Sequence, residues 1–138
     1  MNFKKPSMQQ LNDLLEYYQA GRYADAEKLS LSITQEFPKY QFAWKVLASV
    51  LKKTGRISES LVPSQKSVQL DPLDSEAHNN LANTLQKLGR LNEAEASIRQ
   101  AIALKPDFSQ AHSSLGNILR EMDKLEEAEK CLRQSIAL

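Results

Sequence analysis

Two residue types recur along this chain at a fixed spacing of 34 residues, and that period limits what the chain can fold into. The glycines are Gly21, Gly55 and Gly89, and the prolines are Pro38, Pro72 and Pro106. Asp123 stands where the next glycine would fall. Glycine permits a left-handed turn, whereas proline interrupts a helix. The period therefore predicts a repeat protein whose units each hold two short segments.

Both segments of each unit carry apolar residues at helical spacing. Before the glycine, Leu81 and Leu85 form an i, i+4 pair, and Leu115 and Leu119 repeat that pair one unit later. After the glycine, the stripe of the third unit continues with steps of three and four residues, as Leu91, Ala94, Ile98, Ala101 and Ile102. Such spacing is typical of amphipathic helices. Each unit is therefore predicted to be a helical hairpin.

A helical hairpin of 34 residues with glycine at its turn and proline at its end resembles the repeat of the tetratricopeptide repeat (TPR) family. The third unit matches the pattern of the family best, with His78, Leu81, Ala82, Leu85, Gly89, Leu91, Ala94, Ala101 and Pro106. In the second unit, Ser60 and Ser67 replace the two alanines of the second helix. The first unit is the weakest match. The resemblance covers nearly the whole chain.

The resemblance implies an all-α fold, a right-handed α-α superhelical solenoid of four TPR units. Its predicted organisation is a leader at 1–6 followed by a single domain at 7–138, with repeats at 7–40, 41–74, 75–108 and 109–138. One hairpin cannot bury its apolar face alone, so neighbouring hairpins are expected to stack.

Asparagines on the first helices sharpen this comparison. Asn79, Asn80 and Asn83 lie before the turn of the third repeat, and Asn117 occupies the place of Asn83 in the fourth. Similar asparagines line the inner face of the repeat arrays in O-linked N-acetylglucosamine transferase and in bacterial multidomain TPR proteins. The first two repeats lack most of them, so the likeness is local.

In this family the first helices line the concave side, which implies a peptide-binding groove. An asparagine amide can pair with both the N–H and the carbonyl of an extended peptide. The predicted groove residues are Lys45, Ser49, Lys52, Asn79, Asn80, Asn83, Lys87, Asn117 and Arg120. Cations outnumber anions across the inner positions of the chain, which favours acidic ligands. Alternatively, these side chains form solvated helix faces.

The inner positions of the first repeat are apolar where later repeats are polar. The predicted apolar interaction patch consists of Met8, Leu11, Leu15, Tyr18 and Phe42. Exposed apolar patches mark interaction surfaces. In the alternative interpretation, a leader folded back through Phe3 covers the patch.

Charge and terminal composition exclude several classes of protein. A net charge of +1 gives no basic surface for nucleic acid and no attraction to anionic membranes. The chain has no apolar segment of signal-peptide or membrane-spanning type. Its lone Cys131 cannot form an internal disulfide. A cytoplasmic protein is expected.

No group of residues predicts catalysis or a cofactor. His78 and His112 lie one repeat apart but lack companions at metal-ligand spacing, so packing or a hydrogen bond is the expected role. Cys131 has no motif partner for nucleophilic catalysis. We therefore expect no metal site, no cofactor and no catalytic residues.

Three functional hypotheses remain open. The first is a non-catalytic interaction module that binds a peptide or protein. The second is the recognition segment of a larger enzyme, a glycosyltransferase or sulfotransferase whose catalytic part lies beyond residue 138. The third is a scaffold that self-assembles into a homo-oligomer through the terminal helix, where Leu132 and Ile136 continue an apolar stripe.

Overall fold

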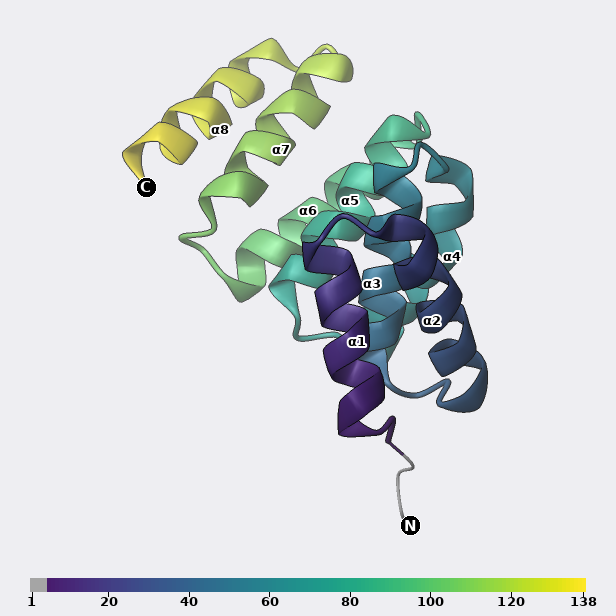
Figure 1. The fold of residues 1–138 in the computed structure, drawn as a ribbon. Helices are drawn as coiled ribbons and strands as arrows, with labels where there is room; N and C mark the ends of the chain where they lie inside the picture. Colours follow the sequence, from purple (N-terminus) through teal and green to yellow (C-terminus); the bar gives the residue numbers. More distant parts are fainter. Residues whose placement is uncertain (1–4) are drawn as a thin grey trace. The chain divides into compact units, whose positions relative to one another are not determined.

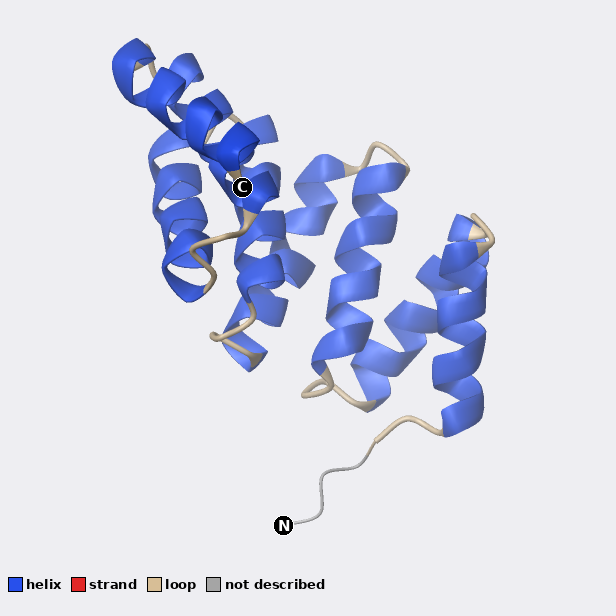
Figure 2. Ribbon diagram, turned by 90° about the vertical axis from the view of Figure 1, so that its left-hand side faces the viewer, coloured by secondary structure: helices blue, strands red, loops and turns tan. Residues whose placement is uncertain are grey.

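The computed structural model describes residues 5–138, which form helices only; no strand occurs among them (Figures 1 and 2). The helices are α1 (Met8–Gln19), α2 (Tyr23–Glu36), α3 (Gln41–Lys53), α4 (Ile57–Leu70), α5 (Ser75–Lys87), α6 (Leu91–Leu104), α7 (Ser109–Glu121) and α8 (Leu125–Ala137). The predicted all-α class and the two helices per repeat are confirmed. Of the predicted leader, residues 1–4 lie outside the described residues.

The turn inside each hairpin requires a left-handed backbone at one residue. Gly21 has φ +74°, and Gly55 and Gly89 are similar. The next residue, Arg22, donates its backbone N–H to the Tyr17 carbonyl at 2.8 Å, which closes the helix end in a Schellman motif. Asp123 holds the same place in the fourth hairpin with φ +66°, a conformation that Asp tolerates better than most residues do.

The chain divides into two compact units, Met1–Asp71 and Pro72–Leu138. The first contains α1 to α4 and the second contains α5 to α8, so each unit consists of two hairpins.

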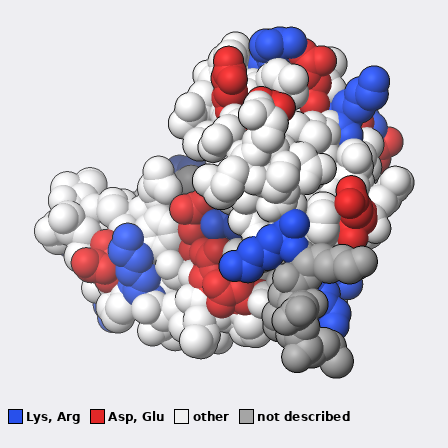
Figure 3. Space-filling model, turned by 60° about the horizontal axis from the view of Figure 1, so that its bottom comes forward, with Lys and Arg blue, Asp and Glu red and all other residues white. Residues whose placement is uncertain are grey.

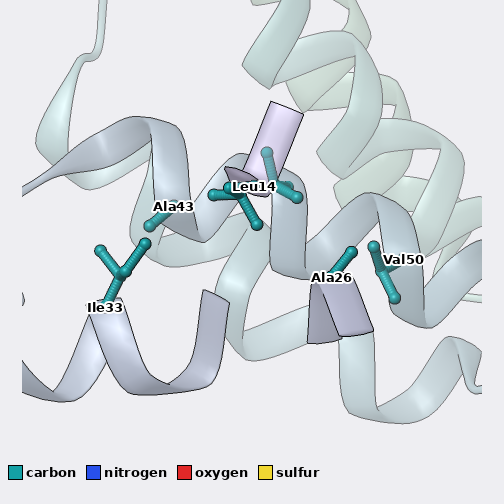
Figure 4. Packing of buried hydrophobic residues seen from close by; sticks show 6 residues of the cluster. Leu14, Ala26, Ile33, Ala43 and Val50 are labelled. Carbon is teal, nitrogen blue, oxygen red and sulfur yellow. The ribbon is translucent and has the colours of Figure 1, made fainter. Parts of the chain in front are cut away.

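In the first unit, a cluster of fully or nearly buried apolar residues joins α1, α2 and α3 (Figure 4). Its members are Leu14, Ala26, Ile33, Ala43, Val46 and Val50. On α4, the two serines that replace alanine are also buried. Ser60 donates its hydroxyl to the Ile57 carbonyl at 2.7 Å, and Ser67 donates to the Ser64 carbonyl at 3.0 Å. Because each hydroxyl has an acceptor on its own helix, serine fits these positions without an unsatisfied donor.

The second unit packs α5 against α6 and α7 against α8. Its buried apolar residues include Leu81, Ala82, Leu85, Ala94, Ile98, Ala101, Ala111, Leu115, Ile118, Leu119 and Ala128. At Gly116, α7 approaches α8 so closely that an added Cβ atom would lie 2.7 Å from Cγ of Leu132 and 3.3 Å from the Ala128 carbonyl oxygen. Leu132 is therefore packed against α7, whereas Ile136 is 87% exposed.

Gly116→Ala tests this close approach. Alanine favours a helix over glycine by about 1 kcal/mol. The overlap with Leu132 opposes that gain, and we expect a net loss of about 1–2 kcal/mol in the free energy of unfolding, measured by urea denaturation. Removing the obstacle should reverse the sign. In a Leu132→Ala background, the same Gly116→Ala change should be neutral or stabilising. If Gly116→Ala alone raised the free energy of unfolding by the full helix-propensity difference, the close packing of Gly116 against Leu132 would be contradicted.

Candidate functional site

The predicted groove residues fall into two sets, one on α3 in the first unit and the other on α5 and α7 in the second. In the second unit, α5 and α7 contact each other, and Gln86 Nε2 donates to Glu121 Oε1 at 2.6 Å across them. Asn83 and Asn117 occupy equivalent positions on these helices, and both are half-buried. The second unit therefore carries two amides of the same register on adjacent helices.

The orientation of the Asn117 amide is fixed by a neighbour. Arg120 Nη2 donates to Asn117 Oδ1 at 2.7 Å. A guanidinium group only donates, so the amide oxygen must face Arg120 and the NH₂ group is left for another partner. The arrangement presents an N–H donor suited to a peptide carbonyl.

Asn79 differs from the other predicted groove asparagines, because it is only 4% exposed. No described residue hydrogen-bonds its buried Oδ1. The sequence spacing places Asn79 on the inner side of α5, but the structure encloses it, and a bound chain could not reach its amide in this conformation. Asn80 is half-buried and Lys87 is exposed.

Charges on the inner positions of the second unit balance. Lys87 and Arg120 are matched by Glu76 and Glu121, all of them exposed. Acidic and basic side chains are also interspersed on the face shown in Figure 3. The excess of cations predicted from the sequence therefore comes from α3 of the first unit, where Lys45 and Lys52 are half-buried, as is Ser49, and Lys53 is exposed.

The predicted apolar patch in the first unit includes several exposed apolar side chains. Met8 is 72% exposed, Leu15 42% and Phe42 37%. Leu11 and Tyr18 are half-buried, and the Tyr18 ring packs at 6.1 Å, centroid to centroid, from Tyr23. Tyr18 therefore belongs partly to the core of the first unit.

In the alternative interpretation, the leader folds back through Phe3 and covers this patch, but Phe3 lies outside the described residues.

His78, His112 and Trp44 occupy one repeat position and make the same hydrogen bond. Trp44 Nε1 donates to the Pro38 carbonyl at 2.9 Å. His78 Nε2 and His112 Nε2 lie 2.8 Å from the carbonyl oxygens six residues before them, at the repeat prolines. A carbonyl only accepts, so Nε2 of each histidine carries the proton. The expected hydrogen-bonding role is confirmed.

Residues 5–138 contain neither a cluster of metal ligands nor a membrane-spanning helix. No three His, Cys, Asp or Glu side chains come together there as a metal site would require. None of the helices has the length and apolar character needed to cross a bilayer.

Cys131 on α8 is half-buried. Burial raises the pKa of its thiol, Glu127 raises it further, and Arg99 and Lys130 oppose the shift. The thiol is therefore protonated at neutral pH, a poor state for a nucleophile.

Sequence reasoning missed a hollow in the second unit. It lies beside His112, among α6, α7 and α8, and has a volume of about 490 Å³. The sequence carries one related signal, the smaller His112 at the repeat position of Trp44, but His78 shares it, so this signal does not locate the hollow.

Comparison with known proteins identifies the repeat. Residues 75–108 and 109–138 each match the family profile of the tetratricopeptide repeat. No curated protein sequence matches the chain.

Similar solved structures include a crystal structure of MamA, which is 19% identical with a TM-score of 0.87 over 93% of this chain and 75% of that one. YrrB, described as a TPR protein with an unusual peptide-binding site, is 20% identical with a TM-score of 0.86 over 93% and 66%.

A mutant O-GlcNAc transferase of Thermobaculum terrenum is 23% identical with a TM-score of 0.72. The match covers 83% of this chain but only 23% of that enzyme. These likenesses and the two profile matches confirm the predicted fold class and the resemblance stated from the sequence. The chain has the fold of TPR solenoid proteins, and two tetratricopeptide repeats lie at residues 75–108 and 109–138.

Proposed function

We propose that the chain is a non-catalytic interaction module that binds an extended peptide segment of a protein partner through its first helices. The observation that carries this proposal is the pair of equivalent amides, Asn83 and Asn117, on the adjacent helices α5 and α7. A TPR fold is typically an interaction scaffold, which supports the same class of function.

The amides explain how the module would bind without a strict sequence motif. Asn117 offers its NH₂ group, because Arg120 holds the amide oxygen at 2.7 Å. A peptide carbonyl accepts from that group whatever side chain the peptide carries. Asn83 provides a second amide one repeat away. Recognition would then depend on the peptide backbone, with side chains adding preference.

The first unit carries surfaces with side-chain preferences of their own. The lysines of α3, Lys45, Lys52 and Lys53, favour acidic side chains. The patch formed by Met8, Leu11, Leu15, Tyr18 and Phe42 favours apolar ones. A partner segment that is both acidic and apolar fits these surfaces. The near-neutral charge of the chain favours a protein ligand over nucleic acid or a membrane. The proposed module would act in the cytoplasm and would need no cofactor.

The second candidate is the recognition segment of a larger glycosyltransferase. Its support is the likeness to the O-GlcNAc transferase structure, of which this chain would cover only 23%. Determining whether the reading frame continues past residue 138 into a catalytic domain distinguishes this candidate from a free-standing module.

The amide pair can be tested with peptides selected from a random library of unstructured 12-residue sequences. Asn83→Ala and Asn117→Ala should each weaken binding of the selected peptides by about 0.5–1.5 kcal/mol, or roughly twofold to tenfold, measured by fluorescence anisotropy. Asn92→Ala on the exposed side of α6 is the matched control and should bind as the unmodified chain does. Equal losses in all three variants would argue against the groove.

The apolar patch permits an even closer control. Leu15 on α1 is 42% exposed and Leu31 on α2 is 41% exposed, so both changes to glutamine remove similar exposed apolar surface. Leu15→Gln should weaken binding of the apolar library peptides, whereas Leu31→Gln should not. Both variants should keep a free energy of unfolding within about 0.5 kcal/mol of that of the unmodified chain, since exposed sites tolerate such changes. Peptide affinity that is insensitive to Leu15 would exclude the patch.

We also propose that the exposed end of α8 mediates self-association. Ile136→Lys should abolish any rise of molar mass with concentration, because a charge would oppose burial of that apolar end. Light scattering over a concentration series measures this against the 15.6 kDa monomer. Val62→Lys, at a site 65% exposed on α4, is the control. An unmodified chain that stays monomeric throughout would rule the idea out. Leu132 is unsuitable for the test, because it packs near Gly116.

A further inference from the structure

The hollow lies beside His112, at a repeat position that holds a larger side chain in the first unit. In the first unit, that position holds Trp44, whose indole N–H bonds the Pro38 carbonyl at 2.9 Å. In the second unit, His112 makes the corresponding bond to Pro106 at 2.8 Å. The imidazole thus preserves the polar contact of the indole but lacks its fused six-membered ring. The smaller imidazole therefore occupies less of the space beside α6 and α8 than an indole at this position would.

The walls of this hollow are mainly apolar. Ile102 and Ala103 of α6 and Leu115 of α7 line it, together with the half-buried thiol of Cys131 on α8. Its volume of about 490 Å³ lies within the range of pockets that bind small molecules, about 300–1,000 Å³. Imidazole and sulfur atoms both make favourable contacts with aromatic rings. The interior therefore suits a flat aromatic group.

The rim of the hollow carries an excess of positive charge. Arg99 is paired with Glu95 at 2.8 Å and with Glu127 at 3.3 Å. Lys130 also lies on the rim, and no carboxylate of the described residues forms an ion pair with it. An anionic group on the ligand would supply the missing partner for Lys130.

We propose that this hollow is a binding site for a small aromatic carboxylate of about the size of an indole, with the ring against His112 and Cys131 and the carboxylate at Lys130. The site uses residues of α6, α7 and α8 and none of the predicted groove residues. It is therefore independent of the peptide-binding proposal, and either one can fail without the other.

Indole-3-acetate is a suitable probe, with uncharged indole and cationic tryptamine for comparison. Titration calorimetry of the full chain should show saturable binding of indole-3-acetate with a dissociation constant of about 0.1–1 mM, typical of a ligand this small. Indole should bind about twofold to fivefold more weakly, and tryptamine more weakly still. Bound indole-3-acetate should also slow alkylation of Cys131 by iodoacetamide, because the thiol lines the site.

His112→Trp is the decisive variant, since it restores the residue found at position 44 and can keep the hydrogen bond to Pro106. It should fill the hollow and abolish binding while retaining helical content. Ala103→Phe is the second variant, for use if His112→Trp misfolds. Ala103 is exposed and lines the hollow, so a phenylalanine ring there should block the site. Lys130→Gln should reduce indole-3-acetate binding to the level of indole, whereas Lys28→Gln on α2 should not change it. Absence of saturable binding, or unchanged binding in folded His112→Trp, would overturn the proposal.

Discussion

The structure depends on the close approach of the two helices within each hairpin. This approach requires a small side chain at one equivalent position in the second helix of each hairpin. Those residues are Ala26, Ser60, Ala94 and Ala128, and none is more than 3% exposed. A larger side chain would separate the helices and expose the apolar stripes that hold neighbouring hairpins together. The left-handed turn is the second requirement, because it brings the two stripes face to face.

Periodicity made most of the fold predictable from the sequence. Each repeated glycine marks a turn with positive φ, and each repeated proline lies just after a second helix, as Pro38 follows α2. Even the weakest repeat obeys this pattern, although Leu14 occupies the place where the later repeats have Ala48, Ala82 and Gly116. Leu14 is fully buried. The first hairpin therefore accommodates a larger residue at a position that elsewhere permits close contact.

The candidate site was less predictable, because residue spacing gives the direction of a side chain but not the depth of packing around it. Asn79 and Asn83 both fall on the inner side of α5 by spacing, yet Asn79 is buried and Asn83 is half-buried. The bond that orients Asn117 depends on the conformation of Arg120, which the spacing does not specify. The hollow beside His112 likewise depends on how side chains of α6, α7 and α8 pack together, which a hydrophobic pattern does not specify.

Two kinds of exchange between the repeats of this chain change side-chain volume while the new polar side chain is hydrogen-bonded. Serine on α4 replaces alanine, and its hydroxyl is satisfied by the carbonyl three residues earlier. Histidine replaces tryptophan and retains the bond to the repeat proline. Because an unsatisfied buried donor costs about 1–3 kcal/mol, substitutions that preserve the bond are tolerated even when they alter the space around it. Such exchanges alter the space between the helices while the new polar group keeps a hydrogen-bond partner.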